Sequence, residues 1–283
     1  MDTDKRVARV FPRRTKATPD DDLVFVNCPP TIAMFMDPPT QVHVSCTFTA
    51  DQRRAEDLAY QWEVLGVPVK VGGPAYGDRG GNFEPGMYLK HGYVITSRGC
   101  TKQCWFCDAW KREGPLRELP LTEGWNLLDN NILACSEAHI RKVFAMLAGQ
   151  PKRPLFTGGL EPSYLRPWHV DLLRDVKAER LYFAYDTPDD LEPLVEAGRL
   201  LRAGGIATRG DVLKCYVLLG YRGDTFSAAE KRLKDAWRAG FMPYAMLYRD
   251  DRGQAPEGWK DFYRTWSRPQ MVAAQLKGIE VMK

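Results

Sequence analysis

Strand and helix signals alternate from His91 to Leu247, and this alternation constrains the fold more than any other feature of the sequence. Short runs rich in β-branched and aromatic residues are followed by longer stretches with apolar residues at helical spacing. The expected strands are 93–96, 125–128, 154–157, 181–185, 215–219 and 242–247. Strands separated by helices pair in parallel, so the sequence predicts an α/β fold. A full barrel needs eight such units, so six predict a partial (βα)6 TIM-like barrel.

A smaller α/β pattern precedes these repeats and predicts a short N-terminal extension. Residues 23–27 are apolar, residues 41–48 alternate like a strand, and residues 67–71 form a further strand signal. Between the last two, residues 50–65 predict a helix whose apolar face consists of Ala55, Leu58, Ala59, Trp62 and Leu65. The expected regions are a basic flexible arm (1–22), a small α/β segment (23–87), the partial barrel (88–250) and a C-terminal helical extension (251–283).

The arm is predicted from a group of positive charges: Lys5, Arg6, Arg9, Arg13, Arg14 and Lys16. Such a group either contacts nucleic acid or another polyanion, or forms a solvated tail. The whole chain has 40 Lys and Arg against 36 Asp and Glu, a net charge of +4. This near balance excludes a strongly basic, histone-like binder and leaves only local basic patches.

The sequence predicts a cytoplasmic protein without a membrane span. It has no apolar run of about 18 residues, and its polar N-terminus lacks the apolar core of a secretory signal. Its seven cysteines are unevenly placed, because three lie within eight residues and the others are scattered: Cys28, Cys46, Cys135 and Cys215. In a reducing compartment, the close group favours a metal or redox site over disulfides.

That close group consists of Cys100, Cys104 and Cys107, in the loop that follows the first strand of the predicted sheet. In parallel α/β folds, active sites lie at the carboxyl ends of the strands. Three thiolates can occupy three corners of a soft metal centre and leave one metal position open. A structural zinc site usually has four protein ligands, and no second C-x2-C follows. The spacing favours a catalytic cluster; a zinc or structural iron–sulfur site is the alternative.

The C-x3-C-x2-C spacing, with the aromatic Phe106 before the last cysteine, resembles the signature of the radical S-adenosylmethionine superfamily. The resemblance covers residues 88–249, and the compact chain is similar to small phage-borne or orphan members. It implies that Cys100, Cys104 and Cys107 hold a 4Fe-4S cluster whose fourth iron binds S-adenosylmethionine. It also implies a flavodoxin or ferredoxin-type electron donor and a 5′-deoxyadenosyl radical that abstracts hydrogen from a substrate.

The resemblance further implies cofactor contacts at the ends of the later strands. They fall on Asp129, Asn130 and Asn131 after the second strand, Gly158, Gly159 and Glu161 after the third, Tyr185 and Asp186 after the fourth, and Gly220 and Tyr221 after the fifth. Phe106, within the cysteine motif, is a further expected cofactor contact. The chain lacks the Gly-Gly-Glu that the family often carries after the second strand. Other roles remain open for these residues. Those after the second strand can pack in the core, those after the third strand can form a plain turn, and Asp186 can cap a helix.

Residues 44–74 resemble a shortened cobalamin-binding domain, but the Asp-x-His-x-x-Gly motif of that domain is missing. We therefore expect no cobalamin. No catalytic residue is assigned, although Arg249 and Asp250 end the sixth strand, where they can face a substrate. Cys135 and Cys215 either relay a hydrogen atom or are structural.

The substrate is expected to be a nucleic-acid base or a nucleotide, on the strength of the basic arm and of aromatics near the C-terminus. These aromatics, Trp259, Phe262, Tyr263 and Trp266, alternate with Lys260, Arg264 and Arg268. A C-terminal helix that packs on the barrel explains them equally well. The alternatives are a peptide or small-metabolite substrate, or a non-catalytic, metal-stabilised binding module.

Overall fold

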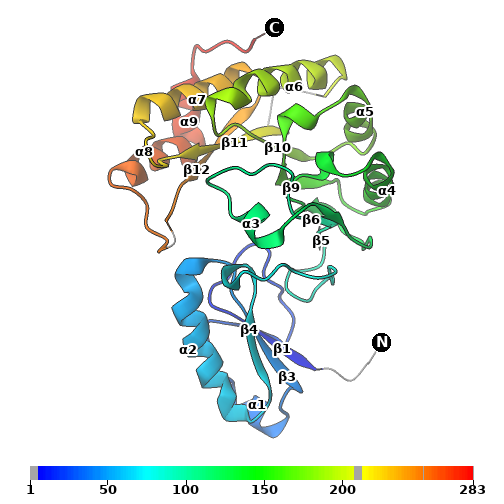
Figure 1. Cartoon of the computed structure of the whole chain (residues 1–283), viewed down its shortest axis with the longest axis vertical. Coiled ribbons are helices and arrows are strands. Elements are labelled where there is room, and N and C mark those ends of the chain that lie inside the picture. The colour runs from blue at the N-terminus through cyan, green and yellow to red at the C-terminus, as the bar shows by residue number, and fades with distance from the viewer. Residues whose placement is uncertain (1–5, 207–211, 251, 283) are drawn as a thin grey trace.

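The computed structural model describes residues 6–206, 212–250 and 252–282. These residues form two parallel sheets, which Figure 1 shows one above the other. The smaller, N-terminal sheet has the strand order β2-β1-β3-β4. The larger sheet has the order β12-β11-β10-β9-β8-β5. The predicted α/β class with parallel strands is therefore confirmed.

The N-terminal sheet is built as the sequence predicts, except that neither its first strand nor the short helix at Ile32–Met36 was expected. Its elements are β1 (Val7–Phe11), β2 (Val24–Val26), α1 (Ile32–Met36), β3 (Gln41–Ser45), α2 (Gln52–Trp62) and β4 (Val69–Gly72). The predicted helix face is confirmed, because four of its residues are buried against the sheet: Ala55, Leu58, Ala59 and Trp62. This burial joins α2 to the sheet as a βαβ unit.

The prediction of a flexible arm is wrong for Val7–Phe11, because this segment is β1, paired in parallel with both β2 and β3. Ala8 and Val10 are fully buried, and Arg9 is only 8% exposed. Arg9 donates to the carbonyl oxygen of Gly86 at 2.9 Å and pairs with Asp21. A buried arginine with such partners belongs to the fold and not to a solvated tail. Lys5, also assigned to the arm, lies outside the described residues.

The larger sheet contains six strands among the described residues, and every pair of neighbours is parallel. The strands are β5 (Tyr93–Val94), β8 (Asn126–Leu127), β9 (Leu155–Leu160), β10 (Arg180–Ala184), β11 (Leu213–Leu219) and β12 (Met242–Leu247). Each strand pairs with its neighbours in chain order, so β5 and β12 form the two edges. The carboxyl ends of all these strands consequently meet along one edge of the sheet.

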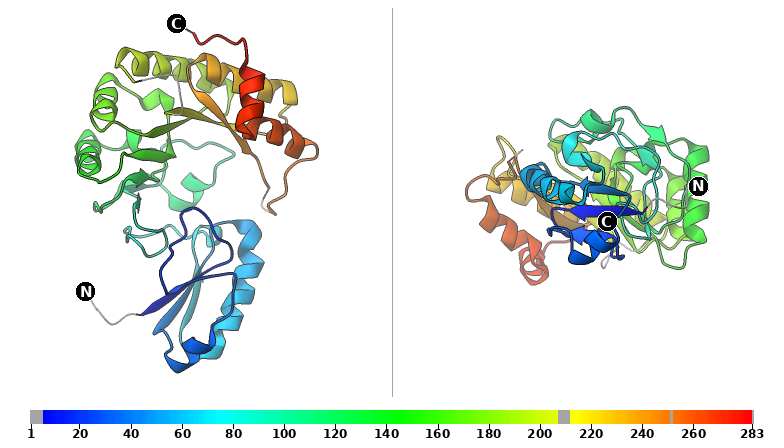
Figure 2. Two further views of the ribbon diagram at one scale, coloured as in Figure 1. Left: turned by 180° about the vertical axis from the view of Figure 1, so that it is seen from behind. Right: turned by 90° about the horizontal axis from the view of Figure 1, so that it is seen from below.

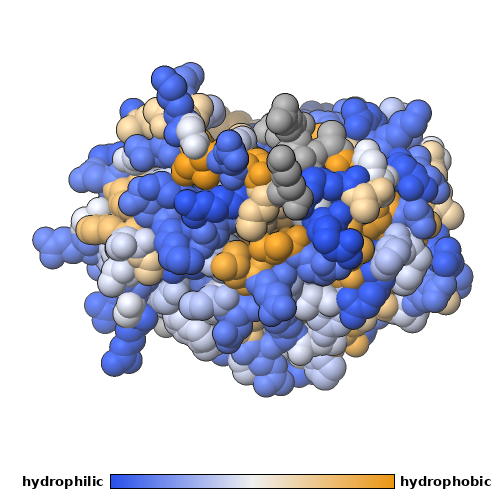
Figure 3. All heavy atoms as spheres, turned by 90° about the horizontal axis from the view of Figure 1, so that it is seen from above, coloured by the Kyte–Doolittle hydropathy of each residue, from blue (hydrophilic) through white to orange (hydrophobic). Residues whose placement is uncertain are grey.

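Helices cover the outer face of the larger sheet in an arc (Figures 1 and 2). They are α4 (Glu137–Ala148), α5 (Pro167–Asp175), α6 (Leu191–Ala203) and α7 (Phe226–Arg238). Two aromatic pairs lie in this core. Phe144 of α4 and Phe156 of β9 have ring centroids 5.5 Å apart, and Phe183 of β10 packs edge-on against Phe241, which precedes β12, at 5.1 Å. The side of the molecule away from the N-terminal sheet is mostly hydrophilic, with smaller hydrophobic areas near its centre (Figure 3).

The C-terminal segment forms α8 (Trp259–Ser267) and α9 (Pro269–Leu276), and α8 packs against β12. Trp259 is 7% exposed and Trp266 is 3% exposed, and both belong to the core. The packing explanation of the C-terminal aromatics is therefore confirmed, and these two rings are not available to stack nucleic-acid bases. Within the described ranges, no helix is both long and apolar enough to span a bilayer.

Candidate active site at the cysteine loop

The three cysteines lie in a loop that leaves the carboxyl end of β5 and lies between the two sheets (Figure 1). A short antiparallel pair, β6 (Ser97–Arg98) and β7 (Arg117–Glu118), closes the base of this loop. The helix α3 (Ala109–Glu113) follows the last cysteine. Sequence patterns do not reveal β6 and β7, because two residues are too few to show an alternation.

Asp129, at the end of β8, fixes the chain where it enters the loop. Its carboxylate accepts hydrogen bonds from the backbone N–H of Thr96 at 2.7 Å and from the hydroxyls of Thr96 and Ser97, each at 2.6 Å. Burial raises the pKa of Asp129, and the hydrogen bonds from Ser97 and Thr96 oppose this rise. With its oxygens occupied in this way, Asp129 is a structural clasp.

Glu113, at the end of α3, forms a second clasp around the residue before Cys100. Its Oε2 accepts from the backbone N–H of Gly99 at 2.9 Å and from the side-chain amide of Asn130 at 2.7 Å. Burial alone raises the pKa of Glu113, but the hydrogen bonds from Gly99, Arg112 and Asn130 lower it below its ordinary value. Gly99 has φ +82°, and a Cβ there would lie 2.3 Å from the carbonyl oxygen of Pro115, so this tight turn requires glycine.

Lys102, between the first two cysteines, ties the loop to the ends of β9 and β10. Its Nζ lies 2.8 Å from Glu161 Oε2 and 3.3 Å from Asp190 Oδ1. Partial burial alone lowers the pKa of Lys102, but its hydrogen bonds and charge interactions with Glu161 and Asp190 raise it well above its ordinary value. The loop is therefore anchored across the carboxyl edge of the sheet.

Aromatic side chains extend this anchoring to the end of β11. The ring of Trp105 packs edge-on against Tyr221, with ring centroids 5.4 Å apart, and against Phe106 at 5.3 Å. The hydroxyls of Thr101 and Tyr164 lie 2.9 Å apart. The loop thus contacts segments that follow the third, fourth and fifth strands of the larger sheet.

The three cysteine thiols are free and only partly exposed. Burial raises the pKa of Cys100, although a hydrogen bond from the backbone N–H of Lys102 lowers it in part. Burial raises the pKa of Cys104 to about 11; the charge of Lys102 lowers it, and those of Cys107 and Cys100 add to the rise. Within the described residues, no set of three or more His, Cys, Asp or Glu side chains is gathered as metal ligands would be. The loop brings the thiols near one another without converging them.

Acidic and amide groups gather beside Lys102 at the carboxyl edge. Asn131, 2% exposed, accepts from the backbone N–H of Glu161 at 3.3 Å, and its buried side-chain nitrogen has no hydrogen-bond partner among the described residues. Asp186 accepts from the backbone N–H of Leu218 at 2.8 Å. Burial raises the pKa of Asp186 to about 6; the Leu218 N–H lowers it and the charge of Asp190 raises it.

The raised pKa of Asp186 predicts a pH-dependent stability. The folded chain binds a proton at the Asp186 carboxyl more tightly than the unfolded chain does. Protonation of Asp186 therefore stabilises the fold fully below about pH 4, and this stabilisation is lost by about pH 6. Between about pH 4 and about pH 6, we expect the unfolding free energy of Asp186→Asn to rise by up to about 3 kcal/mol relative to that of the wild type. Urea unfolding at a series of pH values measures this gain, and a difference that does not change with pH would contradict the prediction.

The structure places the remaining predicted residues less directly at the edge. Gly158 and Gly159 continue β9, and a Cβ at Gly158 would lie 2.2 Å from the carbonyl oxygen of Asp129, so close strand packing explains this glycine. Tyr185 is 2% exposed and belongs to the core. Gly220 donates to Asp224 at 2.9 Å in the turn before Tyr221. Among the other cysteines, Cys135 is 9% and Cys215 0% exposed, which favours structural roles for both.

Two residues that fix the loop were not predicted from the sequence. Glu113 gives no signal, because it ends a helix of only five residues. Asp190 follows Thr187 in a helix-capping sequence, and its Oδ2 accepts from the backbone N–H and the hydroxyl of Thr187 at 2.9 and 3.0 Å. The cap is therefore Thr187 with Asp190, and not Asp186. Its free oxygen, Oδ1, binds Lys102.

Comparison with models of known protein families finds no match, and comparison with curated protein sequences also finds none. The site is therefore interpreted from its own residues and geometry.

Proposed function

We propose that the protein is a radical S-adenosylmethionine enzyme whose 4Fe-4S cluster is held by Cys100, Cys104 and Cys107. The observation that carries the proposal is the position of this C-x3-C-x2-C loop. It lies over the carboxyl ends of six parallel strands and is anchored there by Asp129, Glu113 and Lys102. Active sites of parallel α/β folds lie at this edge. A cluster with three protein ligands also requires a loop held this firmly.

The donor chemistry fits an iron–sulfur cluster. Thiolates are the ligands that such clusters use, and the three thiols here are free and close enough to influence one another's pKa. The backbone N–H of Lys102 already donates to the Cys100 sulfur, a kind of contact that tunes clusters. Within the described residues the three thiols are not gathered as metal ligands would be, so cluster binding requires them to move closer together.

The neighbouring polar groups fit S-adenosylmethionine. Glu161 and Asp190 contact one cation, Lys102. Asp186 lies close enough to Glu161, Asp190 and Arg232 for their charges to affect its pKa, and Arg232 is itself paired with Asp224. This excess of acid suits a ligand that carries a sulfonium and an ammonium group. The buried side-chain nitrogen of Asn131 has no partner in the described part of the chain, so it is a donor available to the carboxylate of that ligand.

A reduced 4Fe-4S cluster held by Cys100, Cys104 and Cys107 would supply one-electron reductive cleavage of S-adenosylmethionine and so permit hydrogen abstraction from a substrate. The protein's own residues hold the cysteine loop in position. Lys102 and the two clasps hold the loop, and Trp105, itself 53% exposed, packs against Tyr221 on the β11 side. Glu161 and Asn131 are the residues we assign to the amino-acid part of the cofactor.

The proposed fold is a partial (βα)6 barrel, supported by six parallel strands in chain order with helices on the outer face. We further propose a cytoplasmic enzyme that takes electrons from a flavodoxin or ferredoxin-type donor. Cobalamin is not part of the proposal.

Anaerobic reconstitution with iron and sulfide tests this function. We expect a protein that carries about four irons and four sulfides per chain, as three cysteine ligands and an open iron position require. Incubation with S-adenosylmethionine and dithionite should then give 5′-deoxyadenosine, detected by mass spectrometry. A protein that binds one zinc ion and forms no 5′-deoxyadenosine would instead be a metal-stabilised binding module.

A further inference from the structure

A large groove separates the N-terminal sheet from the cysteine loop. Its volume is about 920 Å³, and three parts of the chain line it. The first part follows the carboxyl ends of β1, β3 and β4, the second includes α3 of the cysteine loop, and the third follows β12. A Cβ at Gly253, after β12, would lie 2.6 Å from the Cβ of Ala50, so these two segments meet at the groove. In parallel sheets, ligands bind at the carboxyl ends of the strands. The groove is therefore lined by segments that follow such ends in both sheets.

The groove is basic. Five cations line it, against only Asp108 and Asp250, and they are Arg13, Arg79, Lys111, Arg112 and Arg249. Asp250 is already used, because its Oδ1 accepts from two backbone N–H groups of its own turn.

The guanidinium groups differ in whether they already have an acidic partner. Arg13 pairs with Asp51, and Arg112 pairs with Glu113 at 2.9 Å. Among the described residues, Arg249 donates only to the carbonyl oxygen of Gly253, at 2.9 Å. Arg79 makes no side-chain hydrogen bond or ion pair within the part of the chain that the structure describes. Arg79 and Arg249 are therefore the cations that can accept an anion without losing an acidic partner.

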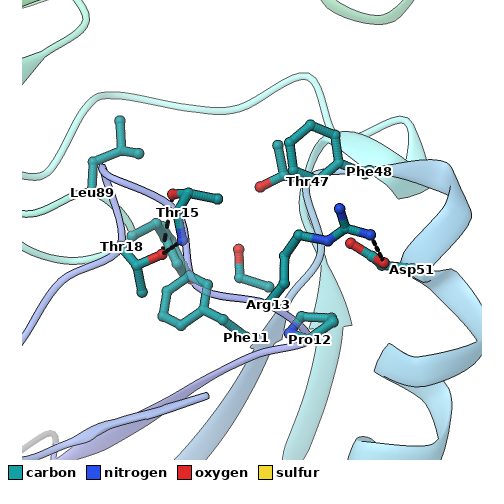
Figure 4. A pocket seen from close by; sticks show the side chains of 11 residues that line it. Phe11, Pro12, Arg13, Thr15, Thr18, Thr47, Phe48, Asp51 and Leu89 are labelled. Carbon is teal, nitrogen blue, oxygen red and sulfur yellow. Dashed lines mark hydrogen bonds and ion pairs between the residues drawn. The ribbon is translucent and has the colours of Figure 1, made fainter. Parts of the chain in front are cut away.

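An exposed aromatic ring lies beside these cations. Phe48 is 46% exposed, and the guanidinium of Arg13 lies over its ring, 5.1 Å from the centroid. Figure 4 shows Arg13 reaching from the β1 side toward Asp51, with Phe48 and Thr47 next to it. The small cavity drawn there has a volume of only about 30 Å³, which is room for a water molecule and no larger ligand. Phe48 and Thr47 also line the large groove.

We propose that the groove binds the substrate of the proposed enzyme as a nucleoside phosphate, with Arg79 and Arg249 on the phosphate and Phe48 stacked on the base. Arginine binds phosphate oxygens through its forked N–H groups. Aromatic rings accept any base by stacking, and the hydroxyls of Thr47 and Thr49 add polar contacts. The volume suits a single nucleotide. This inference rests on the proposed function for its chemistry, but the binding itself requires neither cluster nor cofactor.

Calorimetric titration of the metal-free, full-length protein tests the inference. The ligands are the common ribonucleoside 5′-monophosphates, the matching nucleosides, a short single-stranded oligonucleotide and poly-glutamate. We expect nucleotide binding that weakens about tenfold in Arg79→Ala and about 100-fold in the double variant with Arg249→Ala. Nucleosides without phosphate should bind at least about tenfold more weakly than their monophosphates.

The matched control is the double variant Arg141→Ala and Arg264→Ala, which removes two positive charges outside the groove. These arginines are exposed and pair with Glu137 and Asp261. This control should bind nucleotides as the wild type does, since distant surface charges are screened. The single variant Arg79→Ala removes no side-chain hydrogen bond or ion pair among the described residues, so it reports on binding even if the Arg249 variant loosens its loop.

The possible binding results lead to different conclusions. Tighter binding of the oligonucleotide than of any monophosphate assigns the groove to a nucleotide within a strand, and the reverse order assigns it to a free nucleotide. Either result supports the inference. Absence of binding by every nucleotide and by the oligonucleotide, equal binding of poly-glutamate, or indifference to Arg79 and Arg249 would overturn it. Because no cluster is present, failure of the radical chemistry is detected separately, by the absence of 5′-deoxyadenosine.

Discussion

Cys104→Ser should leave the chain folded but abolish binding of the proposed iron–sulfur cluster. Serine keeps the size of the side chain and replaces a soft thiolate by a hard hydroxyl, which iron–sulfur clusters rarely accept as a ligand. We expect the visible absorbance of the reconstituted protein to be lost. Formation of 5′-deoxyadenosine should fall by more than about 100-fold, beyond the effect of removing a group that only supports a ligand. Absorbance, iron content and product mass spectrometry measure these losses.

The matched control is Cys28→Ser, since Cys28 is also a free and partly exposed cysteine but lies in the N-terminal part of the chain. This variant should retain iron, absorbance and product formation. If Cys104→Ser kept its iron, or if both variants lost it equally, Cys104 would not be a cluster ligand. Far-UV circular dichroism confirms that each variant remains folded.

Asp129→Ala should cause the largest loss of stability among the site residues. The substitution removes the acceptor of three hydrogen bonds and leaves the N–H of Thr96 and the hydroxyls of Thr96 and Ser97 buried without a partner. Unsatisfied buried groups are costly, so we expect a loss of about 3–5 kcal/mol in unfolding free energy. Urea unfolding followed by tryptophan fluorescence measures this loss.

Ser97→Ala provides the graded comparison, because it removes only one of the three hydrogen bonds and leaves the carboxylate in place. Its expected cost is about 1 kcal/mol. Two variants of equal stability would show that Asp129 does not act through these contacts. Because the clasp holds the entrance of the cysteine loop, Asp129→Ala should also make the loop more sensitive to limited proteolysis.

The larger sheet was predictable because each strand has its own local signal. The limits of β12 agree with the prediction residue for residue. The strand β9 is longer than expected, because Gly158 and Gly159 indicate a loop from sequence but continue the strand to Leu160. Here glycine is required by the close approach of the Asp129 backbone, a contact between different strands that local patterns do not contain.

The errors and omissions share a physical cause. Arg9 looks like part of a solvated tail because its partner at Gly86 is 77 residues away in the sequence. Lys102 and Asp190 are 88 residues apart, so their ion pair exists only once the strand ends meet. The cysteine motif needed no such contact, because its spacing is visible in the sequence alone. The residues that hold the motif in place could be identified only from the folded structure.

The chain order of the larger sheet has a consequence for its synthesis. Each new strand, from β8 to β12, joins the edge left by the strand before it, so the sheet can grow as the chain leaves the ribosome. The cysteine loop follows the first of these strands, but Glu161 and Asp190, which hold Lys102, are made later. The contacts of Lys102 with Glu161 and Asp190 can therefore form only after β10 and the turn that follows it have been made. We expect cluster insertion to follow completion of β10, and cells short of iron to accumulate a folded chain with free thiols.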